Sequence, residues 1–185
     1  MAGDPINTAV WGEADVYIAP LATAAPATNV AFSTIPAWKF VGLLDGAAGF
    51  AEAQSLDQTD HNAWGYGVVA TTYKGQKTTR TFTCLEDNST VMGLFYDTSG
   101  MTFNDTLGTY SGPLGVKDYT ESFKIAFEVR SGGKIKRYIS ANYAQAVPSG
   151  DATEGEDNLQ ARPVTVTVFP TSGQVLWTTY KGAAA

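Results

Sequence analysis

The chain has 185 residues, of which 44% are hydrophobic and 16% charged, and its formal net charge is -6. That length is typical of one domain with its own core, so we expect a single domain over 1–185. An acidic chain argues against a protein that binds nucleic acid, because phosphate binding needs clustered Lys and Arg.

The single cysteine, Cys84, excludes an internal disulfide. No basic stretch precedes an apolar run, and no apolar run is long enough for a bilayer, so we expect neither a signal peptide nor a membrane protein.

Strand signals dominate the chain. Runs rich in Val, Ile, Thr, Tyr and Phe recur between Gly, Pro and Asn residues, and several of them alternate apolar with polar side chains. The segments with this signal are 14–19, 38–44, 77–85, 121–130, 134–141, 164–169 and 174–180. A set of short strands of this number predicts a mainly β fold, either a sandwich or a partial barrel.

Two of these patterns predict which face of a strand is buried. Segments 121–130 and 134–141 are joined by Ser-Gly-Gly and predict a β-hairpin with one apolar face. In 77–85, Arg80, Phe82 and Cys84 alternate with threonines, so we expect those three side chains on the core side.

One short helix is predicted at about residues 88–96. Asn88 can cap its N-terminus, and Val91, Leu94 and Phe95 follow at helical spacing. Such a helix would close one side of the core.

Two long connections, 45–67 and 97–119, carry no strand or helix signal that we can assign. The first contains Phe50, Trp64 and Tyr66. Because no strand or helix is predicted there to pack against them, we expect these three aromatic side chains to be exposed. Long loops are commonly functional, and unsupported aromatic side chains in them indicate surfaces that become buried against a partner.

The residues of a catalytic or metal site are missing. His61 is the only histidine, and although Asp57 and Asp60 precede it, no second nitrogen or thiolate ligand lies nearby. Residues 65–70 match a dinucleotide-binding pattern but are followed by a β-prone run instead of a helix. The acidic segment 151–157 lacks the glycine and oxygen spacing of a calcium loop. We therefore expect no enzymatic activity, no cofactor and no metal.

Three stretches, 38–46, 60–88 and 124–170, resemble the major tail protein, or tail tube protein, of siphophages that infect actinobacteria. The most specific elements are Phe82-Thr83-Cys84-Leu85-Glu86-Asp87-Asn88 before a short helix, and the acidic run 150–159 before a Val/Thr strand. The resemblance spans most of the chain. It departs from the family in 97–119, which is longer and richer in glycine than expected.

The resemblance implies a virion protein with a small β-sandwich and one flanking helix. Such subunits form hexameric rings that stack into a hollow tail tube, through which phage DNA passes without specific binding. The implied partners are other copies of the chain and the tape measure, tail tip and tail terminator proteins, with no membrane.

The residues expected at contacts between subunits or rings are aromatic or charged. They are Phe50, Asp57, Asp60, His61, Trp64, Tyr66, Lys134, Lys136, Arg137, Asp151, Glu154, Glu156 and Asp157. Small polar side chains are expected to line the channel: Thr79, Thr81, Thr83, Thr165 and Thr167.

Two other readings remain open at the level of sequence. A capsid decoration or carbohydrate-binding module would use Trp64 and Tyr66 as a platform for sugar stacking. An enzyme would need a site assembled from carboxylates far apart in the chain.

Overall fold

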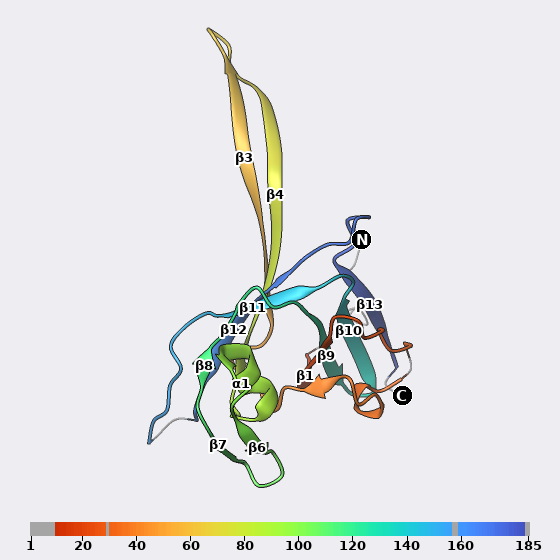
Figure 1. Cartoon of the computed structure of the whole chain (residues 1–185). Helices are drawn as coiled ribbons and strands as arrows, with labels where there is room; N and C mark the ends of the chain where they lie inside the picture. The colour runs from red at the N-terminus through yellow and green to blue at the C-terminus, as the bar shows by residue number, and fades with distance from the viewer. Residues whose placement is uncertain (1–9, 29, 157–158, 184–185) are drawn as a thin grey trace.

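The computed structural model describes residues 10–28, 30–156 and 159–183, and this part of the chain is mainly β with one α-helix (Figure 1). In chain order its elements are β1 (Glu13–Pro20), η2 (Phe32–Thr34), β2 (Lys39–Phe40), β3 (Ala51–Ala63), β4 (Gly67–Cys84), α1 (Ser89–Phe95), β5 (Tyr96–Asp97), β6 (Thr102–Asn104), β7 (Thr109–Ser111), β8 (Gly115–Val116), β9 (Phe123–Ser131), β10 (Lys134–Ser140), β11 (Ala144–Pro148), β12 (Arg162–Val168) and β13 (Trp177–Ala183). The predicted β class and the single short helix are confirmed.

The main sheet folds back on itself to make two layers. Its strand order is β13-β10-β9-β11-β12-β4-β3, and β1 pairs with both β9 and β2. β9 and β11 pair only at Phe123 and Ala144, so the sheet bends at that point. One layer contains β2-β1-β9-β10-β13 and the other contains β11-β12-β4-β3. The predicted 121–130/134–141 hairpin is confirmed as β9 and β10.

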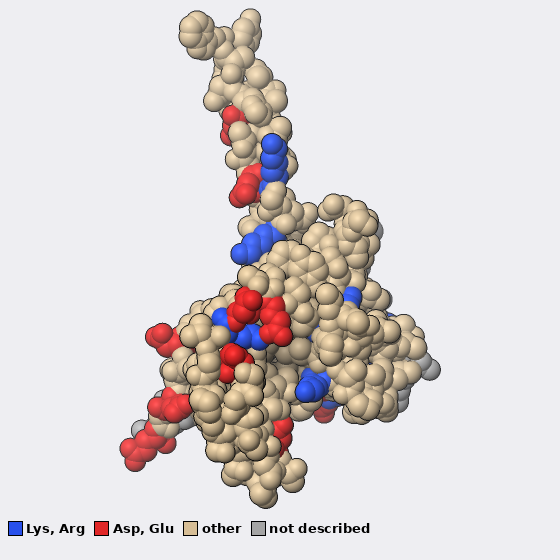
Figure 2. Space-filling view, in the orientation of Figure 1, with Lys and Arg blue, Asp and Glu red and all other residues tan. Residues whose placement is uncertain are grey.

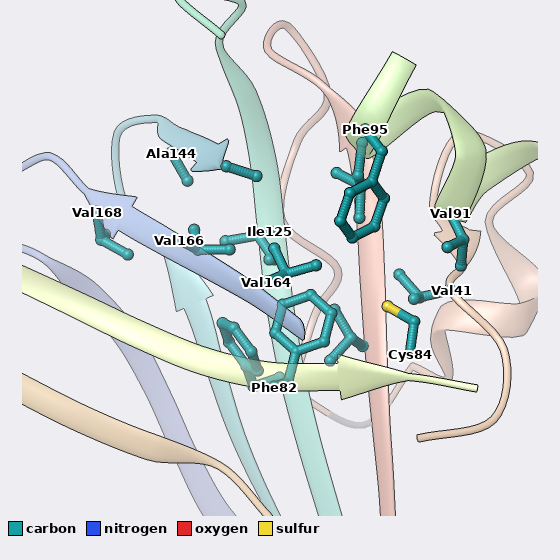
Figure 3. Packing of buried hydrophobic residues seen from close by; sticks show 14 residues of the cluster. Val41, Phe82, Cys84, Val91, Phe95, Ile125, Ala144, Val164, Val166 and Val168 are labelled. Atoms are coloured by element: carbon teal, nitrogen blue, oxygen red, sulfur yellow. The ribbon is translucent and has the colours of Figure 1, made fainter. Parts of the chain in front are cut away.

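The main core lies between the layers (Figure 3). Val164, Val166 and Val168 alternate with polar residues along β12, and all three are buried against Phe82 on β4 and Phe127 on β9. Complete burial of each such valine contributes about 1.5–3 kcal/mol. The predicted inward face of β4, with Arg80, Phe82 and Cys84, is also confirmed.

The predicted helix closes one end of this core. Asn88 Oδ1 accepts a hydrogen bond from the Val91 N–H at 2.9 Å, as expected of an N-cap, and its Nδ2 donates to the Val41 carbonyl at 2.7 Å. Leu94 and Phe95 face the valines of β12 within one cluster. The helix is therefore fixed by its cap at one end and by its apolar face along its length.

A second cluster covers the outer face of β1, β9 and β10. Phe32 and Trp38, from the segment between β1 and β2, pack on Tyr17, Ala126 and Ile139. This layer of the sandwich is consequently covered on both faces.

The prediction that 45–67 is a loop is wrong. Most of it belongs to the long hairpin β3–β4, of which residues 54–77 stand away from the body as an arm (Figure 1). Strand periodicity was hidden because both faces of the arm meet solvent, so neither face needs to be apolar. The 97–119 connection agrees better with its prediction, although it contains two small antiparallel pairs, β5–β8 and β6–β7.

Candidate functional site

Five threonines form a compact group on the side of β4 and β12 that faces away from the core. Thr79 lies opposite Thr167, and Thr81 lies opposite Thr165. Thr83 follows on β4, opposite Pro163. All five side chains are half-buried, whereas their neighbours along each strand point into the core.

The same face continues without charge onto the flanking strands. On β3, Ala51 and Ala53 lie opposite Thr81 and Thr79; on β11, Gln145 and Val147 lie opposite Thr167 and Thr165. We call this surface the neutral face: Ala51, Ala53, Thr79, Thr81, Thr83, Gln145, Val147, Thr165 and Thr167. The next outward position on β4 is Lys77, at the base of the arm.

Both edges of this four-stranded layer are open. Within the described residues β3 pairs with β4 alone, and β11 pairs with β12 and touches β9 at one position. Unpaired N–H and C=O groups on such edges favour pairing with another chain.

The arm presents large apolar side chains to solvent. Trp64 at its tip is 101% exposed, Tyr66 is 86% exposed, and Val69 and Tyr73 are more than half exposed. Phe50 was predicted to be exposed with them, but that prediction is wrong. It packs edge-on against Phe127 with ring centroids 5.1 Å apart.

Among the residues that the structure describes, no group of three or more His, Cys, Asp or Glu side chains could hold a metal ion. Their helices include none that is both long and apolar enough to cross a membrane. The family model described as "Phage tail tube protein" matches residues 1–183 of the sequence.

The chain belongs to the phage tail tube protein family. A comparison with curated proteins finds no match. Membership makes it a structural component of the virion tail, which assembles with copies of itself and with other tail components. The predicted family is thereby confirmed.

Polar contacts across the arm of the tail tube protein involve the predicted residues Asp60 and His61. Asp60 Oδ1 accepts hydrogen bonds from Thr71 at 2.8 Å and Gln58 at 2.9 Å, while His61 Nε2 lies 3.1 Å from Thr72 Oγ1. The hydrogen bonds from Gln58 and Thr71 lower the pKa of Asp60. Asp57 lies opposite Lys74. The Asp60–Thr71 and His61–Thr72 contacts join β3 to β4 and stabilise their pairing, whereas Gln58 lies beside Asp60 on β3.

The acidic loop, defined as residues 149–160, joins β11 to β12 at the lower left of Figure 1, where Figure 2 shows acidic side chains. Arg162, buried at its base, donates to Asp87 at 2.6 Å and to Glu154 at 3.2 Å. Asp151 and Glu156 are exposed, and Asp157 lies outside the described residues. Arg162 could not be recognised from local pattern, because its partner Asp87 is far away in the chain.

The three predicted basic contact residues of the tail tube protein differ in their surroundings. Lys134 is exposed, and Lys136 is half-buried over the ring of Tyr138. Arg137 is only 3% exposed, so its prediction as a surface contact is wrong. Its Nε donates to Glu128, and its Nη1 donates to the carbonyls of Thr28 and Val30 at 3.0 and 2.8 Å. Arg137 therefore ties the segment between β1 and β2 to the sheet.

Proposed function

We propose that this tail tube protein polymerises into stacked hexameric rings, with the neutral face lining the channel through which phage DNA passes. The observation that carries the proposal is the combination of an uncharged face and two open edges in one four-stranded layer. The other layer, β2-β1-β9-β10-β13, has no such open face. Among the described residues, the outer face of its strands β1, β9 and β10 is covered by the cluster around Phe32 and Trp38.

Strand direction supports ring closure. Neighbours in the order β11, β12, β4, β3 are antiparallel, so β3 and β11 run in opposite directions. β3 of one copy can therefore pair antiparallel with β11 of the next copy. Repetition around a closed ring satisfies every edge and produces a continuous barrel from heterologous contacts.

The composition of the neutral face suits a DNA conduit. Lysine or arginine in the channel would bind phosphate, with an affinity that accumulates over many rings. Thr, Ala, Gln and Val provide a surface that holds neither phosphate nor counterions. DNA would slide along such a wall without specific binding, and no catalytic step is required.

The arm is the candidate for contact between rings. The arm projects far from the body, and Trp64 and Tyr66 at its end are exposed (Figure 1). The end of the arm would therefore be the first part of a subunit to contact the next ring. Burial of such aromatic side chains against a neighbour would stabilise stacking. The tape measure protein would occupy the channel, and the tail tip and terminator proteins would cap the two ends.

Electron microscopy of the purified protein tests the proposal, with a truncated arm as the informative variant. Removal of 57–74, with the strands rejoined by Asn-Gly, leaves Phe50 and the body intact. We expect tubes of constant diameter from the wild type and only single rings or monomers from the truncated protein, which should keep its thermal stability. Persistent wild-type monomers that bind glycans through Trp64 would instead favour a binding module.

A further inference from the structure

A cavity of about 470 Å³ opens at one end of the sandwich, between β1, β10 and the segment before β3. Its wall includes Phe50, Tyr138, Arg80 and Lys136. This cavity is separate from both the neutral face and the tip of the arm.

Arg80 is a buried cation with unused donors. It is 8% exposed, and its guanidinium carbon lies 4.4 Å from the ring centre of Tyr138 and 4.7 Å from that of Phe127. Its Nε and Nη1 have no hydrogen-bond partner among the described residues. The nearest carboxylate oxygen, on Glu52, is 4.0 Å from Nη1. Buried donors are almost always paired in folded proteins, so these two indicate a missing acceptor.

The wall contains two cations, Arg80 and Lys136, and two acids, Glu13 and Asp45. Lys136 Nζ lies 4.8 Å from the ring centre of Tyr138. The acids that line the cavity are already engaged: Glu13 accepts from Arg130 Nε at 3.1 Å, and Asp45 accepts from the Ala47 N–H at 2.9 Å. Neither acid bonds to Arg80, so the acceptor for its two unpaired donors has to come from outside this copy, and a carboxylate is the acceptor that best matches a guanidinium.

We propose that the cavity binds the acidic loop of the neighbouring copy, through Asp151 or Glu156. This inference rests on the proposed ring. Because β3 and β11 pair antiparallel there, the end of β11 at Pro148 in one copy meets the start of β3 at Ala51 in the next. The cavity opens at Phe50, immediately before β3, and the acidic loop begins immediately after Pro148.

A copy cannot fill its own cavity with this loop. The loop projects on the left of the body in Figure 1, whereas β10, which contributes Lys136 and Tyr138, lies on the right. The contact therefore joins unlike surfaces of two copies, as a cyclic ring requires.

Charge reversal tests the contact. Lys136→Glu should raise the protein concentration at which half of the subunits assemble at least tenfold. Combination with Asp151→Lys and Glu156→Lys in the same chain should return it to within threefold of wild type. Lys181→Glu is the matched control, since Lys181 is exposed opposite Lys136 on β13 but does not line the cavity, and it should change assembly less than threefold.

Arg80→Met provides a second variant. It removes the unpaired donors and retains an apolar chain among the rings, so the monomer should keep its melting temperature while assembly weakens at least tenfold. Wild-type tubes together with unchanged assembly of Lys136→Glu and Arg80→Met would overturn this inference and leave the proposed function standing. Failure of the triple variant to recover would exclude the acidic loop as the occupant. Absence of wild-type tubes would contradict the proposed function itself.

Discussion

Thr81 on β4 lies directly opposite Thr165 on β12, on the side of the sheet that faces away from the core. The pair is at the centre of the neutral face, so its side chains can be changed without disturbing the valines behind it. A substitution at Thr81 or Thr165 therefore tests the lining of the channel without testing the stability of the fold.

Thr165→Lys places one cation per subunit at the centre of the proposed channel. The fold should tolerate it, with a change in unfolding free energy of about 0.5 kcal/mol or less, since the residue faces away from the core. Tubes should still form but should now retain DNA at low salt and release it at high salt. A DNA-binding assay on purified tubes measures this, with Thr178→Lys on β13 as the control. If Thr165→Lys tubes retained no more DNA than the control tubes, the neutral face would lie outside the channel.

Arg137 and Glu128 form an ion pair in which each residue is only 3% exposed. Arg137→Met should lower the unfolding free energy by about 3 kcal/mol, because Glu128 keeps only Arg130 and the Thr28 and Val30 carbonyls lose their donor. Urea denaturation of the monomer measures the loss. Lys134→Met, at an exposed site on the same strand, should change stability by less than about 0.5 kcal/mol. Equal stabilities would contradict a structural role for Arg137.

Gly42 has a φ of +105°, and a Cβ there would lie 2.5 Å from Glu86 Oε2 and 2.7 Å from Asn88 Nδ2. Those side chains accept from Leu43 and cap α1. Gly42→Ala should therefore cost about 1–3 kcal/mol through backbone strain and displacement of the helix cap. Gly46→Ala is the control, because no atom lies within 4 Å of its Cβ position. Thermal denaturation measures the difference. Equal melting temperatures for the two variants would show that the backbone at Gly42 does not help to position the helix cap.

Alkaline pH should destabilise the fold in a defined window. Burial raises the pKa of Cys84 from 9.0 to about 12, and burial followed by the charge of Asp15 raises that of Tyr17 from 10.0 to about 12. Below pH 9 both groups are protonated in the folded and unfolded states, so their contribution to stability is complete. Between pH 9 and 12 the unfolded chain releases protons that the folded chain retains, and stability falls by about 1.4 kcal/mol per pH unit for each group that has ionised only in the unfolded state.

Tyr17→Phe should flatten the upper part of this profile, above pH 10, because it removes one of the two groups. Urea titrations at successive pH values measure the slope. A slope unchanged by the substitution would show that Tyr17 ionises equally in both states.

Much of the body could be predicted from local pattern. Strands with one buried face, such as β9 and β12, alternate visibly in sequence, and Asn88 before an apolar run specified the helix. The family resemblance supplied the expected use of the fold. These features depend on residues that are neighbours in the chain.

The missed features depend on residues far apart in the chain or on partners outside it. The arm alternates poorly because both of its faces meet solvent, and β11 is only five residues long. Arg137 was predicted to be a surface contact and is instead buried. Its burial follows from Glu128, which only the folded sheet brings near it.

A cryo-electron microscopy reconstruction of the assembled protein tests the central claim most directly. We predict a closed ring in which β3 of each copy pairs with β11 of the next and the neutral face lines the channel. A tube whose channel is lined by β1, β9 and β10, or whose β3 and β11 edges never meet another copy, would contradict it.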